Sequence, residues 1–158
     1  MTRRTTAKAP KRRVGEIEED AYVSLLRTAD LLTRGVEQVM RQHEVSPTQY
    51  NVLRILRGTL AGLPCSEIGN RMITRDPDIT RLVDRLEKRG LVSRGRDSRD
   101  RRVVLARITA KGLRLLHAIH GPMTAVHRHQ LSHLGRKHLL TLLHLLEVAR
   151  NSSPSRQG

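Results

Sequence analysis

Hydrophobic residues recur every three to four positions along most of the chain, which is the spacing of amphipathic helices. The longest stretch of this kind begins at Ile17 and ends at Met40. Its first turn is acidic, and acidic side chains there complement the positive end of the helix dipole. The pattern therefore predicts a long first helix over residues 16–43.

Ser46, Pro47 and Gln49 mark the start of a second helix. A serine at the N-cap followed three residues later by glutamine forms a capping box, and proline is favoured at the first helical position. We expect this helix to end near Arg57. Its buried side chains should be Tyr50, Leu53 and Leu56.

Two short helices are expected next, separated by a tight turn. After Leu63–Pro64, which looks extended, the apolar spacing predicts a helix over residues 65–72. Asp76 can cap the following helix, with Pro77 at its first position, and Gly90 is suited to end it because glycine adopts left-handed dihedrals. Two short helices around a tight turn, the second rich in arginine, form a helix-turn-helix candidate.

The next pattern is that of a β-hairpin. Strand-like runs over residues 91–96 and 102–108 flank a short polar stretch. Thr109 can then cap a helix over about 110–130, which should be kinked by an internal proline, and a leucine-dense helix follows over about 136–149. That last helix is apolar over more than one face, so we expect another subunit to cover part of it.

These elements predict a mainly α protein with a small β-hairpin wing, a winged helix-turn-helix. We expect one domain over residues 16–150, preceded by a disordered basic arm over 1–15 and followed by a flexible tail over 151–158. Within the domain, residues 46–108 should form a DNA-binding lobe. The dimerisation helices are expected over about 16–43, 110–130 and 136–149.

Composition narrows the class of protein. The 158 residues include 30 Lys+Arg against 15 Asp+Glu, a formal net charge of +15, which favours polyanionic partners such as nucleic acid. The single cysteine excludes an intramolecular disulfide framework. No apolar run approaches the ~18 residues that span a bilayer, and the basic N-terminus lacks the apolar segment of a secretory signal. We expect a cytoplasmic, nucleoid-associated protein that does not bind membranes.

Much of the positive charge lies between Arg71 and Arg107, where twelve Lys+Arg, eleven of them arginine, face six acids. Arginine suits bidentate contacts to phosphate and guanine. No set of nucleophile, base and orienting group stands out, and no glycine-rich phosphate loop is present. The sequence therefore predicts double-stranded DNA as a partner, no catalysis and no cofactor.

Two motifs are specific enough to suggest a family. The run TRLVDRLEKRGLV from Thr80 to Val92, followed by DSRDRRV from Asp97 to Val103, closely resembles the MarR family of bacterial transcriptional regulators. The resemblance implies a homodimeric regulator, a repressor, that reads a pseudo-palindromic operator with two winged helix-turn-helix lobes. It also implies a small-molecule effector, bound between the dimerisation helices and the lobe, that releases the DNA.

The resemblance also implies roles for single residues. The helix from Asp76 to Arg89 looks like the recognition helix, with Arg85 near phosphate, and the wing resembles one that approaches the minor groove. The expected DNA contacts are Arg75, Asp76, Pro77, Asp78, Thr80, Arg81, Arg85, Arg94, Arg96, Arg99 and Arg101. Asp100 and Arg102 look like the pair that holds the wing's shape. Many relatives have Ser or Thr at Asp76 and Asp78, and carboxylates there can accept a hydrogen bond from cytosine N4.

Three alternatives stay open. An architectural nucleoid protein that coats DNA without sequence preference would also carry this charge. A metal-responsive member of the same family could use the helically spaced pairs His117 with His120 and His129 with His133, although few acids or thiols lie nearby to complete a metal site. Redox sensing could use Cys65, which lies near a predicted helix start, where a thiolate is favoured. The simpler interpretation of Cys65 is a small half-buried residue.

Overall fold

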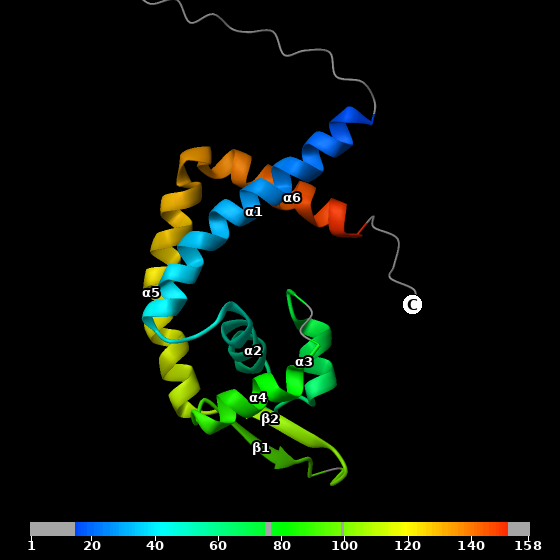
Figure 1. The fold of residues 1–158 in the computed structure, drawn as a ribbon, viewed down its shortest axis with the longest axis vertical. Helices are drawn as coiled ribbons and strands as arrows, with labels where there is room; N and C mark the ends of the chain where they lie inside the picture. The colour runs from blue at the N-terminus through cyan, green and yellow to red at the C-terminus, as the bar shows by residue number, and fades with distance from the viewer. Residues whose placement is uncertain (1–14, 75–76, 99, 152–158) are drawn as a thin grey trace, which may run out of the picture. The chain divides into compact units, whose positions relative to one another are not determined.

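A computed structural model of the chain describes residues 15–74, 77–98 and 100–151. These residues form helices and one two-stranded antiparallel sheet, as predicted (Figure 1). In chain order the elements are α1 (Glu16–Gln42), α2 (Pro47–Arg57), α3 (Cys65–Arg71), α4 (Ile79–Lys88), β1 (Val92–Arg96), β2 (Val104–Ile108), α5 (Ala110–Leu131), the 3-10 helix η1 (Ser132–Leu134) and α6 (Gly135–Asn151). The predicted basic arm and C-terminal tail lie almost wholly outside the described residues.

The described chain divides into two units, one ending at residue 34 and one starting at residue 35. The first unit contains most of α1, whose first turn carries Glu16, Glu18 and Glu19, as the sequence predicts. The side chains of α1 that are buried, Val39 and Met40, both belong to the second unit. The second unit therefore holds the hydrophobic core, and all further elements lie in it.

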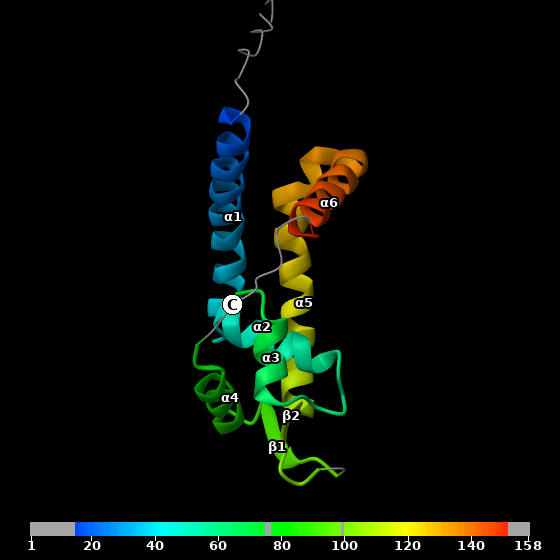
Figure 2. The same cartoon turned by 90° about the vertical axis from the view of Figure 1, so that its right-hand side faces the viewer.

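That core lies where α2, α3 and α4 pack against the hairpin and α5 (Figure 2). Its largest fully buried side chains are aliphatic, and they include Leu53, Leu56, Ile68, Leu82, Leu86 and Ile119. Leu53 and Leu56 are buried as predicted. Tyr50 is only half-buried: it packs against the edge of the core, and the guanidinium of Arg54 lies over its ring, 5.9 Å from the ring centroid.

The helix ends follow the local chemistry of the sequence. The Ser46 hydroxyl accepts a hydrogen bond from the backbone N–H of Gln49 at 3.1 Å, and the Gln49 side chain accepts one from the N–H of Ser46, which completes the predicted capping box. Gly90 has a φ of +70° after α4, and the Thr109 hydroxyl caps α5 by accepting from the N–H of Gly112. Ser46 and Thr109 thus fix the starts of α2 and α5, which lie at the two ends of the predicted lobe.

The start of α4 differs from the prediction. The helix begins at Ile79, and its N-cap is Asp78, whose carboxylate accepts a hydrogen bond from the backbone N–H of Arg81 at 3.3 Å. Pro77 lies in the turn before the helix rather than at its first position. The helix therefore starts two residues later than predicted, with Asp78 as its N-cap, because the sequence Asp-Pro-Asp offers two capping residues. Asp76 itself lies outside the described residues.

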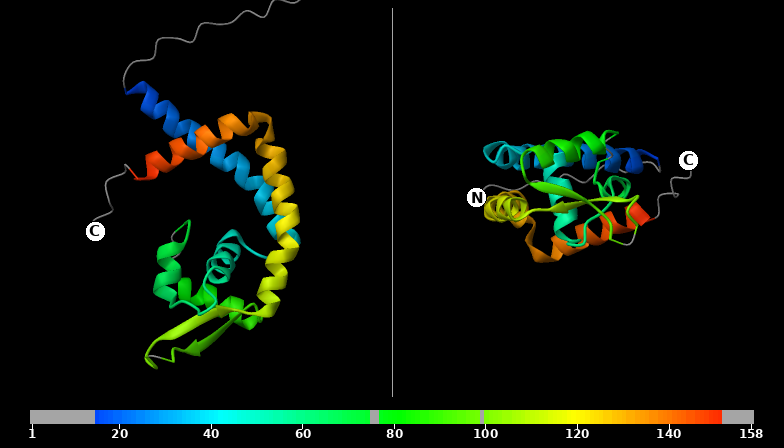
Figure 3. Two further views of the ribbon diagram at one scale, coloured as in Figure 1. Left: turned by 180° about the vertical axis from the view of Figure 1, so that it is seen from behind. Right: turned by 90° about the horizontal axis from the view of Figure 1, so that it is seen from below.

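The hairpin pairs Val92 with Ile108 at its base and Arg96 with Val104 near its tip. It projects beyond the helices at the end of the lobe (Figure 3). Leu63 adds an isolated bridge to the outer side of β2, exchanging backbone hydrogen bonds of 3.0 and 2.9 Å with Ala106. The extended conformation of Leu63 was predicted, but its pairing with the hairpin was not. This bridge attaches the wing to the loop before α3.

The last two helices form as predicted. α5 continues through Pro122, and α6 covers the leucine-dense segment. No residue of α6 is buried. The exposed large apolar side chains of α6 are Leu140, Leu142, Leu143, Leu145 and Val148. An apolar helix without a buried face in its own chain agrees with the expectation that another subunit covers it.

Candidate nucleic-acid interface

α4 separates an apolar face from a charged face. Leu82, Val83 and Leu86 are buried against the core, whereas Arg81 and Arg85 are exposed. Helical spacing places the two arginines about one turn apart, on the side away from the core. The packing of α4 therefore presents two of the predicted contact residues to solvent.

Asp78 and Arg81 form an ion pair at the first turn of this helix. One carboxylate oxygen of Asp78 lies 3.1 Å from Nε of Arg81, while the other accepts the hydrogen bond that caps the helix. The Arg81 side chain is 82% exposed and that of Asp78 is 44% exposed. The sequence predicted both residues as contacts, but it did not predict that they bind each other.

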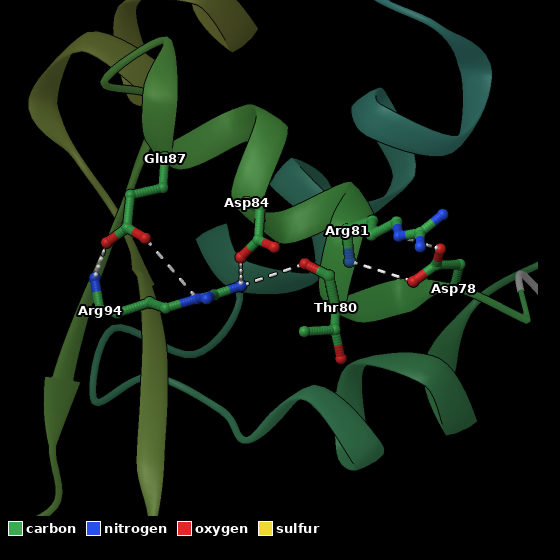
Figure 4. A network of polar contacts seen from close by, with 6 residues as sticks. All are labelled: Asp78, Thr80, Arg81, Asp84, Glu87 and Arg94. Carbon is green, nitrogen blue, oxygen red and sulfur yellow. Dashed lines mark hydrogen bonds and ion pairs between the residues drawn. The ribbon is translucent and has the colours of Figure 1, made fainter.

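Arg94 connects the hairpin to α4 (Figure 4). Its guanidinium lies 2.5 Å from a carboxylate oxygen of Asp84 and 3.8 Å from one of Glu87, and it donates a hydrogen bond of 3.1 Å to the carbonyl of Thr80. The backbone N–H of Arg94 also donates to the Glu87 carboxylate at 3.0 Å. Arg94 was predicted to contact DNA, but here its charge holds β1 against α4.

The tip of the hairpin is organised by short-range hydrogen bonds. The Asp100 carboxylate accepts from the backbone N–H of Arg102 at 2.9 Å, and the guanidinium of Arg96 donates to the carbonyl of Arg101 at 3.0 Å. The Asp100–Arg102 contact agrees with the predicted shaping pair, although it uses the backbone of Arg102. The Arg101 side chain is exposed, in the position expected for a wing contact.

Three predicted contact residues, Arg75, Asp76 and Arg99, lie outside the described residues, so their contacts stay predictions. The predicted contact residues that the structure describes come from α4, from the turn before it and from the hairpin. α4 contributes Thr80, Arg81 and Arg85, the turn before it contributes Pro77 and Asp78, and the hairpin contributes Arg96 and Arg101. Arg94 lies between the two groups and fixes their relative position.

Several basic residues counted in the positive excess of the lobe have structural partners. Nε of Arg107 donates to the carbonyl of Ala61 at 2.9 Å, and the guanidinium of Arg89 donates to that of Glu44 at 2.6 Å. These contacts join segments that are more than forty residues apart in sequence. Sequence spacing alone gave no signal for these contacts. Because both arginines are held by backbone carbonyls, the net charge of this segment overstates the number of arginines available to DNA.

Cys65 is half-buried at the start of α3. Burial raises the pKa of its thiol, Arg94 acts in the opposite direction, and Asp84 adds to the rise. A raised pKa reduces the thiolate fraction at neutral pH, and the thiolate is the reactive form. The environment therefore agrees with the simpler interpretation of Cys65 as a small half-buried residue.

Within the described residues, no group of three or more His, Cys, Asp and Glu side chains is placed to hold a metal ion. The pairs His117 with His120 and His129 with His133 thus have no third ligand of these types there. The side chains of all four are exposed on α5 and η1. None of the helices in the described segments has an apolar stretch long enough to cross a bilayer.

Comparisons with known proteins agree on one family. A family model described as "MarR family" matches residues 45–104. The transcriptional regulator MhqR of Bacillus subtilis is 32% identical over 98 residues, covering 62% of this chain and 67% of MhqR. The transcriptional repressor MdtR of the same organism is 27% identical over 130 residues, covering 82% of this chain and 83% of MdtR.

Solved structures give the same result. A MarR transcription factor from Planctomyces limnophilus is 41% identical, with a TM-score of 0.64, over 82% of this chain and 95% of that one. The regulator PcaV of Streptomyces coelicolor, solved in complex with its natural ligand, is 25% identical, with a TM-score of 0.66, over 80% of this chain and 91% of PcaV. The similarity thus extends well beyond the lobe.

Proposed function

Because the chain belongs to the MarR family of transcriptional regulators, we propose that it acts as a homodimeric repressor that binds a pseudo-palindromic operator. Each lobe places α4 in the major groove and the tip of its hairpin near the adjacent minor groove. Occupancy of the operator blocks transcription. One relative, MdtR, is itself named a repressor, which supports this direction of control.

The observation that carries this proposal is the Arg94 network. Major-groove and minor-groove contacts must be made together, so a helix and a wing that read one half-site need a fixed relative position. The ion pairs of Arg94 with Asp84 and Glu87 provide that connection between β1 and α4. The exposed guanidinium groups of Arg81 and Arg85 on α4, and of Arg101 on the hairpin, are then presented as one surface.

The homodimer is supported by α6. Its five exposed large apolar residues, Leu140, Leu142, Leu143, Leu145 and Val148, would leave a hydrophobic surface in water. Covering them with the same helix of a second copy would remove that surface and place two lobes on one DNA duplex. Two-fold symmetry of the protein then matches the two-fold symmetry of a palindromic site.

We propose further that a small molecule modulates DNA binding. The support is the similarity to PcaV, which was solved with its natural ligand. Such control requires that the ligand bind one arrangement of the dimer more tightly than another. The metal-responsive alternative has less support, since the histidine pairs have no third ligand among the described residues.

An affinity comparison tests the proposal. The protein should bind DNA from the region upstream of its own gene at least ~1,000-fold more tightly than a random duplex of equal length, at ~150–200 mM salt. Fluorescence anisotropy measures both affinities. Arg81→Ala should weaken binding to the upstream duplex, whereas Arg114→Ala, which removes the same charge from α5, should have little effect. Equal affinity for both duplexes would instead favour the architectural nucleoid protein.

A further inference from the structure

The Asp78–Arg81 pair is not explained by its contribution to stability. Exposed ion pairs between neighbouring helical positions add little to the free energy of unfolding. Asp78 already caps α4 through one carboxylate oxygen, which accepts from the backbone N–H of Arg81. The second oxygen, 3.1 Å from Nε of Arg81, is not needed for that cap. A carboxylate on a DNA-facing turn also repels phosphate, and a neutral Ser, Thr or Asn would cap the helix without that repulsion, so the charge of Asp78 calls for another reason.

The pair leaves one particular part of Arg81 available. Its Nε lies 3.1 Å from Asp78, and the side chain is 82% exposed, so the terminal nitrogens of the guanidinium are open to solvent. Those two nitrogens form the planar fork that donates to O6 and N7 of guanine in the major groove. Figure 4 shows the Arg81 side chain extending along the first turn of α4 with Asp78 beside it.

Asp78 also restricts the motion of that fork. An arginine that is 82% exposed samples many rotamers, and ordering it on binding costs conformational entropy. The ion pair holds the guanidinium before DNA arrives, and so lowers this cost. The same carboxylate compensates the charge of Arg81, which weakens its attraction to phosphate at sites without the right base. Both effects increase the difference in affinity between sites with and without the right base, rather than the affinity for DNA in general.

Arg85 provides a contrast on the same helix. It lies about one turn after Arg81, is exposed, and pairs with no carboxylate among the described residues. An unpaired arginine in this position is suited to a phosphate, which it attracts whatever the base sequence. α4 thus carries one arginine oriented by an acid and one that is not.

We infer that Asp78 and Arg81 act together as a guanine-reading pair, in which Arg81 donates both terminal NH₂ groups to one guanine of each half-site and Asp78 fixes their direction. This inference rests on the proposed function, since it requires α4 in the major groove. It makes Asp78 a positioning residue for specificity. It also revises the simpler interpretation in which the Asp78 carboxylate itself accepts from cytosine.

The test measures base preference rather than affinity alone. The starting duplex is one recovered by selection from random DNA. At each half-site position, four versions of this duplex are prepared that differ only in the base pair at that position, with the same change made in both half-sites. Binding of the wild type should be roughly 5- to 150-fold weaker when the critical guanine is replaced. Asp78→Asn keeps a capping oxygen but loses the charge, so the guanine preference should fall several-fold while affinity for random DNA stays equal or rises. Loss of the fold would instead lower both the guanine preference and the affinity for random DNA.

Two variants of arginine complete the experiment. Arg81→Lys keeps the charge but lacks the fork, so it should abolish the guanine preference. Arg85→Ala should weaken binding to all four duplexes equally. The inference is overturned if Asp78→Asn keeps the guanine preference of the wild type. It is also overturned if this variant loses a preference for cytosine instead of the preference for guanine. Either result leaves the proposed function standing. If the wild type binds every duplex as it binds random DNA, the proposed function is overturned and this inference with it.

Discussion

Leu143→Glu should convert the protein from a dimer to a monomer and abolish operator binding. Leu143 is 56% exposed in the single chain, on a helix with no buried residue. If α6 packs against its copy, the substitution places an unpaired carboxylate in the interface twice, because a two-fold interface contains each residue two times. An unpaired buried charge costs about 3–5 kcal/mol, which raises the dimer dissociation constant more than roughly 100-fold.

Sedimentation velocity and operator binding measure this effect on the same samples. Thr141→Glu, on the same helix, introduces the same charge where the side chain is already polar, and it should shift the dissociation constant much less. Circular dichroism of both variants should match that of the wild type. A Leu143→Glu protein that remains dimeric at low micromolar concentration would show that α6 does not form the interface.

Gly112→Ala should strongly destabilise the lobe. A Cβ added at Gly112 would lie 2.4 Å from the carbonyl oxygen of Leu91 and 2.8 Å from a side-chain carbon of Ile108. The carbonyl belongs to the backbone, and it already accepts a hydrogen bond from the N–H of Thr109, so it cannot move freely. Overpacking of this kind costs about 1–3 kcal/mol, which exceeds the gain that alanine ordinarily brings to a helix.

Chemical denaturation at equal protein concentration measures the loss, since the stability of a dimer depends on concentration. Gly69→Ala is the matched control. It also adds a methyl group to a helical glycine, but the new Cβ would have only an ordinary contact, 4.0 Å from Ile79. The control should be neutral or more stable by up to about 1 kcal/mol. Equal denaturation midpoints for the two variants would contradict the close approach of α5 to Leu91.

Much of the fold could be predicted because local chemistry and hydrophobic spacing agree. The capping box at Ser46, the cap at Thr109 and the left-handed Gly90 each depend on residues within a few positions, and all three are confirmed. The predicted start of α4 was two residues too early. Asp76 and Asp78 are both capping residues with a proline between them, so the local sequence does not distinguish the two starts.

The site was harder to predict because its partners come from different elements. The acids on α4 that bind Arg94 lie seven and ten residues before it, and only the fold brings β1 beside that helix. An arginine in a basic segment was therefore interpreted as a DNA contact. Leu63 is a similar case, since its bridge to Ala106 joins residues 43 positions apart. Local patterns identify exposed charge, but tertiary contacts decide which charges remain available.

The most direct test of the central claim is selection from a pool of random DNA duplexes, using the purified full-length protein at ~150–200 mM salt. The account predicts enrichment of one inverted repeat whose half-site centres lie about one helical turn apart, roughly 10–10.5 base pairs. Arg94→Ala should reduce this enrichment, because it releases the wing from α4. Bound DNA that shows no enriched motif, or a motif without two-fold symmetry, would contradict the claim that a symmetric pair of winged lobes reads this sequence.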